Sequence, residues 1–362
     1  MKYIPFILAF WLLACNAPSQ KEETKEEVSS QPRNQADFKK IDFHTHYRYD
    51  REYLVPLLKK WNMQTVLIDV PKEDLIQNDT LWAAMKAQYN KHPDQFYLCA
   101  GFESSNIDDP EFANKIIAKL EDDFANGARM VKVWKIHGMV TKDASGKYIQ
   151  IDDPRIQPVW DHLTKRNIPV IAHIGEPLQA WRPLDENNPH YGYYKEHPEY
   201  HAYNDPEVPQ WEEIMAARDN WIAKNPNLTI VAAHMGSMSH DLKLVAERLD
   251  KYPNMYAETA ARWGDIVLQD PTLVQDFFIK YQDRVLYGTD FGINSLPDPN
   301  NPDNGQGNTI EKRMDMHWQY LSGSDSLLFD RGSLQVKTHS LNLPDSVLRK
   351  FYYDNAMGIL EQ

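Results

Sequence analysis

The hydrophobic and polar positions of the chain follow a regular alternation from residue 39 onward. Short runs of consecutive apolar residues are typical of strands buried in a parallel sheet, and segments with apolar residues every three or four positions are typical of amphipathic helices. Strands are predicted at 39–47, 65–70, 95–102, 128–136, 168–175, 228–236, 254–262 and 284–292. Helices are predicted at 52–62, 81–93, 112–127, 156–167, 211–226, 241–253, 271–282 and 344–360. Every predicted strand is therefore followed by a predicted helix.

This repeated unit predicts an α/β fold in which residues 39–362 form one (β/α)8 barrel. A doubly wound open sheet is the alternative, but it usually has fewer units, and no G-x-G-x-x-G turn follows the first predicted strand. Three long connections, at about 136–154, 176–210 and 292–318, follow strands and therefore lie on the C-terminal face, where barrel active sites are built. The second is rich in Trp and Tyr, which fits either a lid or pocket wall or a surface insertion with its own aromatic cluster.

The first residues differ from the rest of the chain. A lysine near the start, an apolar run and the final letters LLAC make "MKYIPFILAFWLLAC" resemble a bacterial lipoprotein signal that ends in a lipobox. This resemblance implies a signal peptide at 1–14 and a lipid on Cys15, whereas an ordinary signal peptide or short anchor is the alternative. Residues 15–38 are polar and are predicted to form a flexible tether. We therefore expect an exported protein, anchored at Cys15 in the bacterial outer membrane and facing the periplasm or the exterior.

Composition narrows the range of partners. The formal net charge of -13 and the pI of about 5.5 argue against nucleic acid as a partner, because binding to phosphates needs a clustered basic surface. In the predicted mature chain Cys99 is the only cysteine besides Cys15, so an internal disulfide is not expected. Cys99 lies in an apolar run and is predicted to be a small buried hydrophobic residue.

Polar side chains interrupt the apolar strands at matching ends. His44 and His46 close the first predicted strand, and residues two positions apart in an extended chain point to the same side. His173, His234 and Asp290 end the fifth, sixth and eighth predicted strands. Burying four histidines and a carboxylate at one end of a barrel is costly unless they share a partner, and a divalent cation provides one. The pattern therefore predicts a metal site on the C-terminal face.

Four motifs in this order, "DFHTH", "IAHIG", "AAHMGS" and "YGTDF", closely resemble those of the amidohydrolase superfamily and, more narrowly, of its amidohydrolase-2 branch. The resemblance spans essentially everything after the tether. It implies that His44, His46, His173 and Asp290 bind the metal, and that His234 contacts the activated water or a substrate oxygen and assists proton transfer. Neutral imidazoles with one carboxylate suit Zn²⁺, with Mn²⁺, Fe²⁺ or Ni²⁺ as alternatives.

The expected chemistry is attack by a metal-activated water. The metal lowers the pKa of this water from about 15.7 toward ~7, which makes hydroxide available at neutral pH. Asp290 is placed to accept the proton of the attacking water. His234 can stabilise negative charge that develops on the attacked carbonyl.

Lys132, inside the fourth predicted strand, bears on the expected number of ions. Some members of the superfamily carry a carboxylated lysine at this strand that bridges two metals, so Lys132 could bridge in the same way. It could also bind a substrate carboxylate or pair with a neighbouring acid. We therefore expect one ion, with two as the alternative. Lys135 is expected to point to the opposite face from Lys132.

Further candidates surround this predicted centre. They are Trp134, Glu176, Glu258 and Arg262. Glu176 directly follows the fifth predicted strand and Arg262 lies at the end of the seventh, so both could reach the pocket, and an arginine there could clamp a substrate carboxylate. Each could instead be a salt-bridge partner within a loop. The other histidines of polar loops and helix starts are expected to be exposed, namely His190, His197, His201 and His240.

Three functions are compatible with these predictions. The first is a metal-dependent hydrolase of a small molecule with an amide, ester or lactone bond. The second is a metal-dependent decarboxylase of a small carboxylic acid, because the amidohydrolase-2 branch contains such enzymes with nearly the same ligands. The third is a tethered binding protein without turnover, which the intact ligand set argues against. We expect a small-molecule substrate and membrane contact through the lipid anchor only. The sequence leaves the oligomeric state open, although homodimers or tetramers are usual in proteins that resemble this one.

Overall fold

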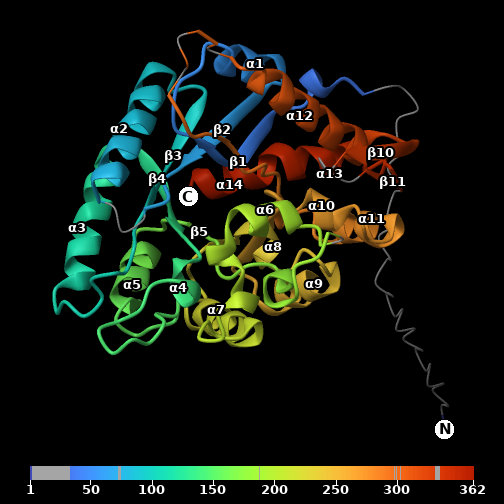
Figure 1. Ribbon diagram of the computed structural model, residues 1–362. Coiled ribbons are helices and arrows are strands. Elements are labelled where there is room, and N and C mark those ends of the chain that lie inside the picture. Colours follow the sequence, from blue (N-terminus) through green and yellow to red (C-terminus); the bar gives the residue numbers. More distant parts are fainter. Residues whose placement is uncertain are drawn as a thin grey trace.

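One sheet of parallel strands forms the centre of the fold (Figure 1). The computed structural model describes residues 33–362 and Met1, except for 72–74, 187, 297, 299, 302 and 331–334. Within these residues the sheet has the strand order β8-β7-β6-β5-β4-β3-β2-β1-β9. Its strands are β1 (Lys40–Tyr47), β2 (Met63–Ile68), β3 (Phe96–Gly101), β4 (Ala128–Val133), β5 (Val170–Ala172), β6 (Ile230–Ala232), β7 (Met255–Glu258), β8 (Val285–Leu286) and β9 (Phe291–Ile293).

The two ends of this sheet meet in one segment of the chain. β8 and most of β9 fall in the segment that was predicted as a single strand, 284–292, and the two lie at opposite ends of the strand order. β8 pairs with β7, while β9 pairs with β1. Between them the Phe43 N–H donates to the Tyr287 carbonyl (2.9 Å), and the Asp290 N–H donates to the His44 carbonyl (2.8 Å). The strand is interrupted at Asp290, whose φ of +65° lies in the left-handed region. The predicted (β/α)8 barrel is therefore confirmed.

Helices cover the outside of the barrel in the predicted order (Figure 1). In α9, Leu242, Val245 and Leu249 are buried on one face, and the Asp241 side chain caps the helix by accepting the Lys243 N–H (3.0 Å). The covering helices are α1 (Leu54–Lys60), α2 (Leu75–Lys91), α3 (Phe112–Ala125), α5 (Gln157–Lys165), α7 (Trp211–Lys224), α9 (Leu242–Lys251), α11 (Pro271–Lys280) and α13 (Asp345–Arg349), which continues through the π-helical turn η5 (Lys350–Asp354) into α14 (Asn355–Leu360).

A packed apolar cluster fills the barrel interior below the histidines. Ile41 and Phe43 of β1 belong to this cluster and are fully buried. His44 and His46 instead line a cavity at the C-terminal end of the barrel, so the inward-facing positions of β1 change from odd to even. The change coincides with a register shift in the pairing of β1 with β2. Such an irregularity re-aims side chains, here toward the candidate site. Cys99 is buried in the same cluster, as predicted.

The connections on the C-terminal side carry most of the additional structure. We call the 176–210 connection the lid. The third long connection is shorter than predicted, because its second half, together with the following residues, is a helix. The antiparallel pair of strands after this helix was not predicted. These elements are α4 (Ile136–Met139), η2 (Leu178–Trp181), α6 (Tyr191–Glu196), η3 (Pro198–Tyr200), η4 (Ala202–Asn204), α8 (Ala233–Gly236), α10 (Trp263–Ile266), α12 (Gln306–Ser322), β10 (Ser326–Asp330) and β11 (Gln335–His339).

Residues 33–38, the end of the predicted tether, lie against the domain and include η1 (Gln35–Asp37). Nη1 of Arg33 donates to the Ser322 carbonyl (2.8 Å), and its Nε lies 2.8 Å from the Asp345 carboxylate. The folded part of the chain therefore begins before the predicted boundary. The predicted signal peptide and the rest of the tether lie outside the described residues, apart from Met1. Among the described helices, none has the length and apolar character needed to cross a bilayer.

Candidate metal centre

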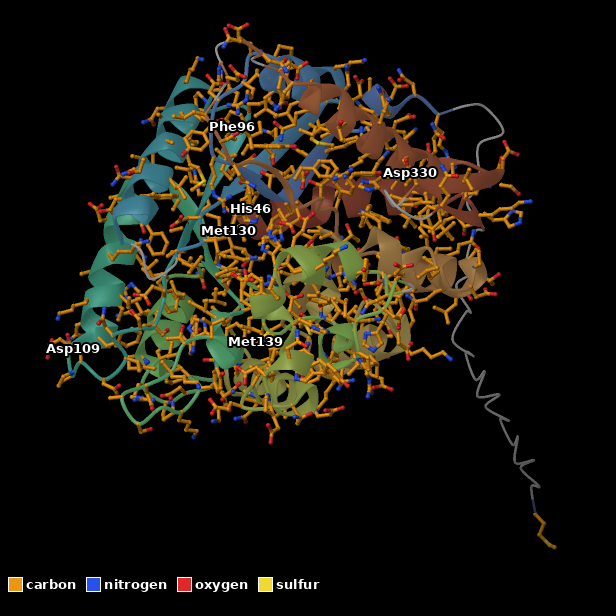
Figure 2. All side chains as sticks on the ribbon, in the orientation of Figure 1. His46, Phe96, Asp109, Met130, Met139 and Asp330 are labelled. Carbon is orange, nitrogen blue, oxygen red and sulfur yellow. The ribbon has the colours of Figure 1, made fainter. Side chains whose placement is uncertain are left out.

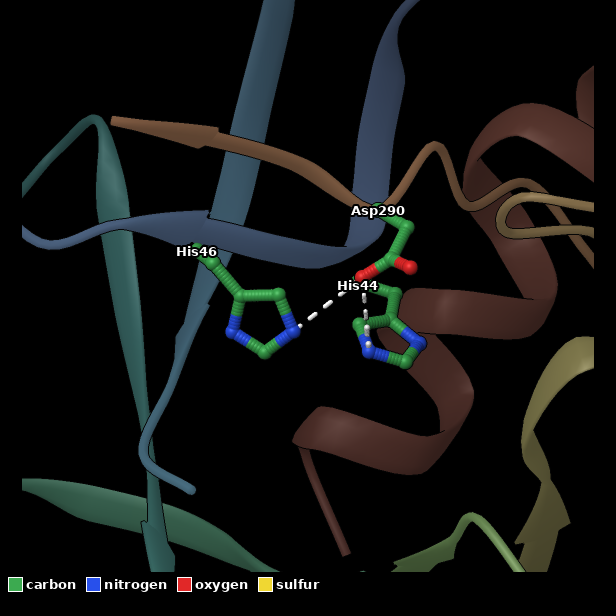
Figure 3. A group of neighbouring side chains, drawn as sticks. All are labelled: His44, His46 and Asp290. Carbon is green, nitrogen blue, oxygen red and sulfur yellow. Dashed lines mark ion pairs between the residues drawn. The ribbon is translucent and has the colours of Figure 1, made fainter. Parts of the chain in front are cut away.

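The structure brings His44, His46 and Asp290 together at the C-terminal end of the barrel (Figure 3). Nε2 of His46 lies 3.1 Å from Oδ1 of Asp290, and Nε2 of His44 lies 3.6 Å from the same oxygen. One ligand atom from each residue lies within 4.8 Å of the others. Figure 2 shows His46 near the centre of the fold. Because the histidines come from β1 and Asp290 lies between β8 and β9, closure of the barrel creates the group.

The opposite ring nitrogens of these histidines are held by acceptors. Nδ1 of His46 lies 3.2 Å from the Ile68 carbonyl, and Nδ1 of His234 lies 2.8 Å from the Ala260 carbonyl. A carbonyl can only accept, so Nδ1 carries the proton and Nε2 keeps its lone pair. Nδ1 of His44 faces a buried carboxylate at the end of β7, at 2.8 Å. Metal-binding histidines are usually oriented by partners of this kind.

His173 and His234 extend the group of imidazoles across β5 and β6. The ring centroids of His173 and His234 are 4.1 Å apart, and those of His234 and His44 are 4.8 Å apart. Nε2 of His173 is buried and has no hydrogen-bond partner within the described residues, which fits a nitrogen that binds a metal. His173 lies outside the tightest groups of potential ligand atoms, which are His44, His46 and Asp290, and His44, His234 and Glu258. It therefore stays a predicted ligand.

The protonation states of the site match those that a metal requires. Burial lowers the pKa values of His44, His46, His173 and His234, so the imidazoles are neutral at pH 7. Burial alone would raise the pKa of Asp290, but the adjacent imidazoles of His46, His44 and His234 hold it well below its usual range. Metals bind neutral imidazoles and ionised carboxylates. The residues present therefore fit a divalent cation.

Lys132 lies inside the barrel beside this group. Its Nζ is 3.3 Å from Nε2 of His44, and the residue is 1% exposed. Burial lowers the pKa of the Lys132 ammonium to about 8. The side chain thus faces inward, where both predicted roles are sterically open to it: a carboxylated bridging ligand and a cation that binds a substrate carboxylate.

The sequence profile of the amidohydrolase-2 group of amidohydrolases matches residues 41–361, nearly the whole of the folded domain. The chain belongs to the amidohydrolase family. This agrees with the resemblance of the four strand-end motifs.

Two solved structures of 2,6-dihydroxybenzoate decarboxylase resemble this amidohydrolase. The one in complex with 2,6-dihydroxybenzoate has 14% sequence identity and a TM-score of 0.52, and the match covers 90% of this chain and 100% of that chain. The one from Rhizobium has 15% identity and a TM-score of 0.51, with coverage of 90% and 99%. At these identities the likeness establishes the fold and leaves the reaction open. Among curated proteins, no significant match to the sequence was found.

A cavity of about 260 Å³ lies over the histidines of this amidohydrolase. Its lining includes Trp134 after β4 and Tyr193 of the lid, so part of the lid is a pocket wall. Arg48 and Asn294 also line the cavity, and the Arg48 guanidinium donates to the Asn294 side-chain carbonyl. The sequence analysis missed both residues. Strand alternation could have found Arg48, because it lies two positions beyond His46.

Lys135 also lines the cavity, which contradicts the predicted alternation with Lys132. The alternation fails because β4 ends at Val133 and the chain then turns into α4. The Lys135 ammonium pairs with the Glu176 carboxylate and donates to the Tyr193 hydroxyl at 2.7 Å. It therefore connects the lid to the barrel.

The other second-rank candidates lie behind the cavity wall. Nη2 of Arg262 is 3.8 Å from Oε2 of Glu176, and both residues are buried. Glu258 is fully buried behind His44 and does not line the cavity. None of the three is among the residues that line the cavity, so a direct role in substrate binding stays a prediction.

The loop histidines that were expected to be exposed are mostly not. Only His197 is exposed among the four, whereas His201 is 2% exposed and its Nε2 lies 2.9 Å from a backbone carbonyl. His190 is half-buried, 3.1 Å from the Asp265 carboxylate, and His240 is half-buried against an aromatic ring. The expectation is wrong for three of them because the lid and its neighbouring turns pack on themselves and on the barrel.

Proposed function

We propose that this amidohydrolase is a metal-dependent hydrolase that cleaves an amide, ester or lactone bond of a small molecule. The observation that carries the proposal is the convergence of the Nε2 atoms of His44 and His46 on the ionised Asp290. Nε2 of His173, which has no hydrogen-bond partner within the described residues, belongs to the same group of imidazoles. This donor set suits Zn²⁺ first, with Mn²⁺, Fe²⁺ or Ni²⁺ as alternatives. When bound, such a cation polarises a substrate oxygen and acidifies water.

Two side chains of the site are suited to move the proton. The Asp290 carboxylate is ionised and its side chain is 30% exposed, so it can accept a proton from an attacking water. Because Nδ1 of His234 donates to a carbonyl, its Nε2 offers a lone pair and not a hydrogen. His234 can therefore stabilise a developing anion only after it has taken a proton. This order refines its predicted role.

The charges of the cavity favour a substrate that carries a carboxylate. Arg48, Lys132 and Lys135 line the cavity, whereas Asp290 is the only carboxylate among the described lining residues. Glu176 compensates Lys135, so Arg48 and Lys132 remain for a substrate acid. This observation supports a second candidate function, a metal-dependent decarboxylase of a small carboxylic acid on the same site.

Product analysis tests the two functions against each other. The metal-loaded protein is incubated in H2¹⁸O with amides, esters and lactones that bear a carboxylate, and with simple carboxylic acids. Hydrolysis is expected to place ¹⁸O in a new carboxyl group without release of CO₂. Release of CO₂ without ¹⁸O incorporation would establish the decarboxylase instead. Absence of both products across the panel, with metal bound, would contradict both candidates.

We also propose export of the protein and lipid anchoring at Cys15, which the lipobox-like sequence of the first residues supports. Cys15→Ser is expected to abolish the incorporation of labelled palmitate and to move the protein from the membrane to the soluble fraction of bacterial cells. Cys99→Ser is the matched control, because Cys99 is buried in β3 and has no access to lipid. Undiminished labelling of the Cys15→Ser protein would contradict this proposal.

A further inference from the structure

One buried carboxylate joins three segments of the barrel behind the candidate metal centre. Glu258, the last residue of β7, is fully buried. Its Oε1 accepts from Nδ1 of His44 at 2.8 Å and from the backbone N–H of His234 at 2.7 Å. Its Oε2 accepts the backbone N–H of Ala260. The side chain therefore connects β1 to the turns that follow β6 and β7.

These contacts determine which nitrogen of His44 carries the proton. Both oxygens of Glu258 accept backbone N–H groups, so the carboxylate acts as an acceptor and the imidazole has to donate. The His44 proton is thereby held on Nδ1, and the Nε2 lone pair faces the cavity, 3.3 Å from the Lys132 amine and 3.6 Å from Oδ1 of Asp290. The hydrogen bond made by one ring nitrogen sets the state of the other.

The same carboxylate holds the backbone of His234 in an unusual conformation. His234 and Met235 have φ values of +58° and +54°, and Ser237 has +61°. Left-handed backbone is unfavourable for a residue with a side chain, because the Cβ atom then crowds the following carbonyl oxygen. The hydrogen bond from the His234 N–H to Glu258 stabilises the first residue of this turn, so Glu258 also fixes where the His234 ring lies.

The absence of a side chain at Gly288 makes room for the Glu258 carboxylate. A Cβ atom at position 288 would lie 2.5 Å from Oε2 of Glu258 and 3.2 Å from Cβ of His44. Gly288 does not have a positive φ, so its backbone conformation would accept other residues and only the space demands glycine. The glycine of the "YGTDF" motif therefore serves a carboxylate on the neighbouring strand.

We propose that Glu258 is the positioning residue of the metal centre, which holds His44 in its Nδ1–H tautomer, and that Gly288 is glycine to make room for it. The inference rests on the metal site of the proposed function. It extends that function by assigning a role to two residues that do not line the cavity. Partners that orient metal-binding histidines typically contribute 10- to 100-fold to metal affinity, on the order of what is expected here.

Glu258→Gln is the decisive variant. A glutamine keeps the shape of the side chain, but its NH₂ group must face either the Ala260 N–H or the nitrogens of His44 and His234, so two donors meet in both orientations. We expect the Zn²⁺ affinity of the full chain, measured by competition with a chromophoric chelator, to fall about 10- to 100-fold. Gly288→Ala is expected to weaken Zn²⁺ binding similarly while Glu258 is still present.

Asp123→Asn is the matched control, because it makes the same change at a buried carboxylate on α3. Its Zn²⁺ affinity is expected to equal that of the unaltered protein. An affinity of Glu258→Gln or Gly288→Ala within twofold of this control, in a folded protein, would overturn the proposal.

The tautomer is measured without any metal or substrate. In the ¹⁵N-histidine-labelled, metal-free protein, the His44 signal is assigned by its loss in His44→Asn, and we expect the Nδ1–H form. An Nε2–H form would overturn the proposal even where a variant fails to fold. A protein that shows the Nδ1–H form but binds no Zn²⁺, Mn²⁺, Fe²⁺ or Ni²⁺ would contradict the proposed function and leave the role of Glu258 in orienting His44 intact.

Discussion

Replacing Asp290 with asparagine is expected to lower turnover by roughly 10²- to 10⁴-fold, the usual contribution of a positioned proton acceptor. The asparagine amide has nearly the same shape and can still contact Nε2 of His46, which lies 3.1 Å from Oδ1 in the unaltered protein. It cannot take a proton from water at neutral pH, however, and it carries no negative charge. The loss should therefore appear in kcat at saturating substrate, with the ¹⁸O-incorporating substrate of the product screen.

The metal content of this variant has to be measured with its activity, because Asp290 is also a predicted ligand. Assays at a saturating metal concentration separate the loss of the proton acceptor from the loss of the ion. Asp123→Asn again provides a control for removing a charge from a buried carboxylate. A loaded Asp290→Asn protein with turnover within threefold of the unaltered protein would exclude Asp290 as the proton acceptor.

The sequence predicted the barrel and the residues at its rim because both depend on local patterns. Continuous apolar runs mark strands that are buried on both faces, and strand ends share one side of a parallel barrel. This is sufficient to bring His44, His46 and Asp290 together. The orientation of β1 was not predictable in this way, because Ile41 and Phe43 also face inward and a register shift with β2 re-aims the histidines.

Predictions based on alternation failed where an element ended earlier than the apolar run. Lys135 was expected to face away from Lys132, but β4 ends at Val133, so the rule no longer applies. The pair β10–β11 was missed for a different reason. Each strand has only two inward-facing positions, Leu327 and Phe329 in β10 and Val336 and Thr338 in β11, so the alternation is too short to predict a strand.

The strand-end motifs contain more information than their ligands. Asp42 of "DFHTH" accepts the Thr289 hydroxyl (2.6 Å) and backbone N–H (3.0 Å) of "YGTDF", which ties β1 to the segment that carries Asp290. Gly288 of the same motif makes room for Glu258. These functions depend on contacts between strands that are distant in sequence. A single sequence therefore identifies such residues only as parts of a motif and cannot assign their roles.

Removal of the metal is expected to lower the thermal stability of the protein and abolish its activity. The predicted ligands His44, His46 and Asp290 come from opposite ends of the chain and meet only in the folded protein. A cation that binds only the folded state therefore stabilises it by about 2.7 kcal/mol at 100 times its Kd. In a domain of this size each kcal/mol of lost stability lowers Tm by roughly 2–4 °C or less. Removal of the metal by a chelator is therefore expected to lower Tm by several degrees. Readdition of Zn²⁺ should restore both the thermal stability and the activity. In His46→Ala, neither chelation nor Zn²⁺ should change the Tm or the activity.

The stoichiometry of the restored protein decides the role of Lys132. One ion per chain is expected, because an uncarboxylated Lys132, whose amine lies 3.3 Å from Nε2 of His44, offers no anionic bridge for a second ion. Elemental analysis of the reloaded protein measures the number of ions per chain. For the His46→Ala variant, the matched control is His197→Ala, which removes an exposed histidine of the lid. Two ions per chain that fall to one in Lys132→Ala would instead show that the lysine is carboxylated and bridges them. In that case Lys132 would be an acidic ligand and would no longer attract a substrate carboxylate, which would leave Arg48 as the cation of the cavity for that purpose.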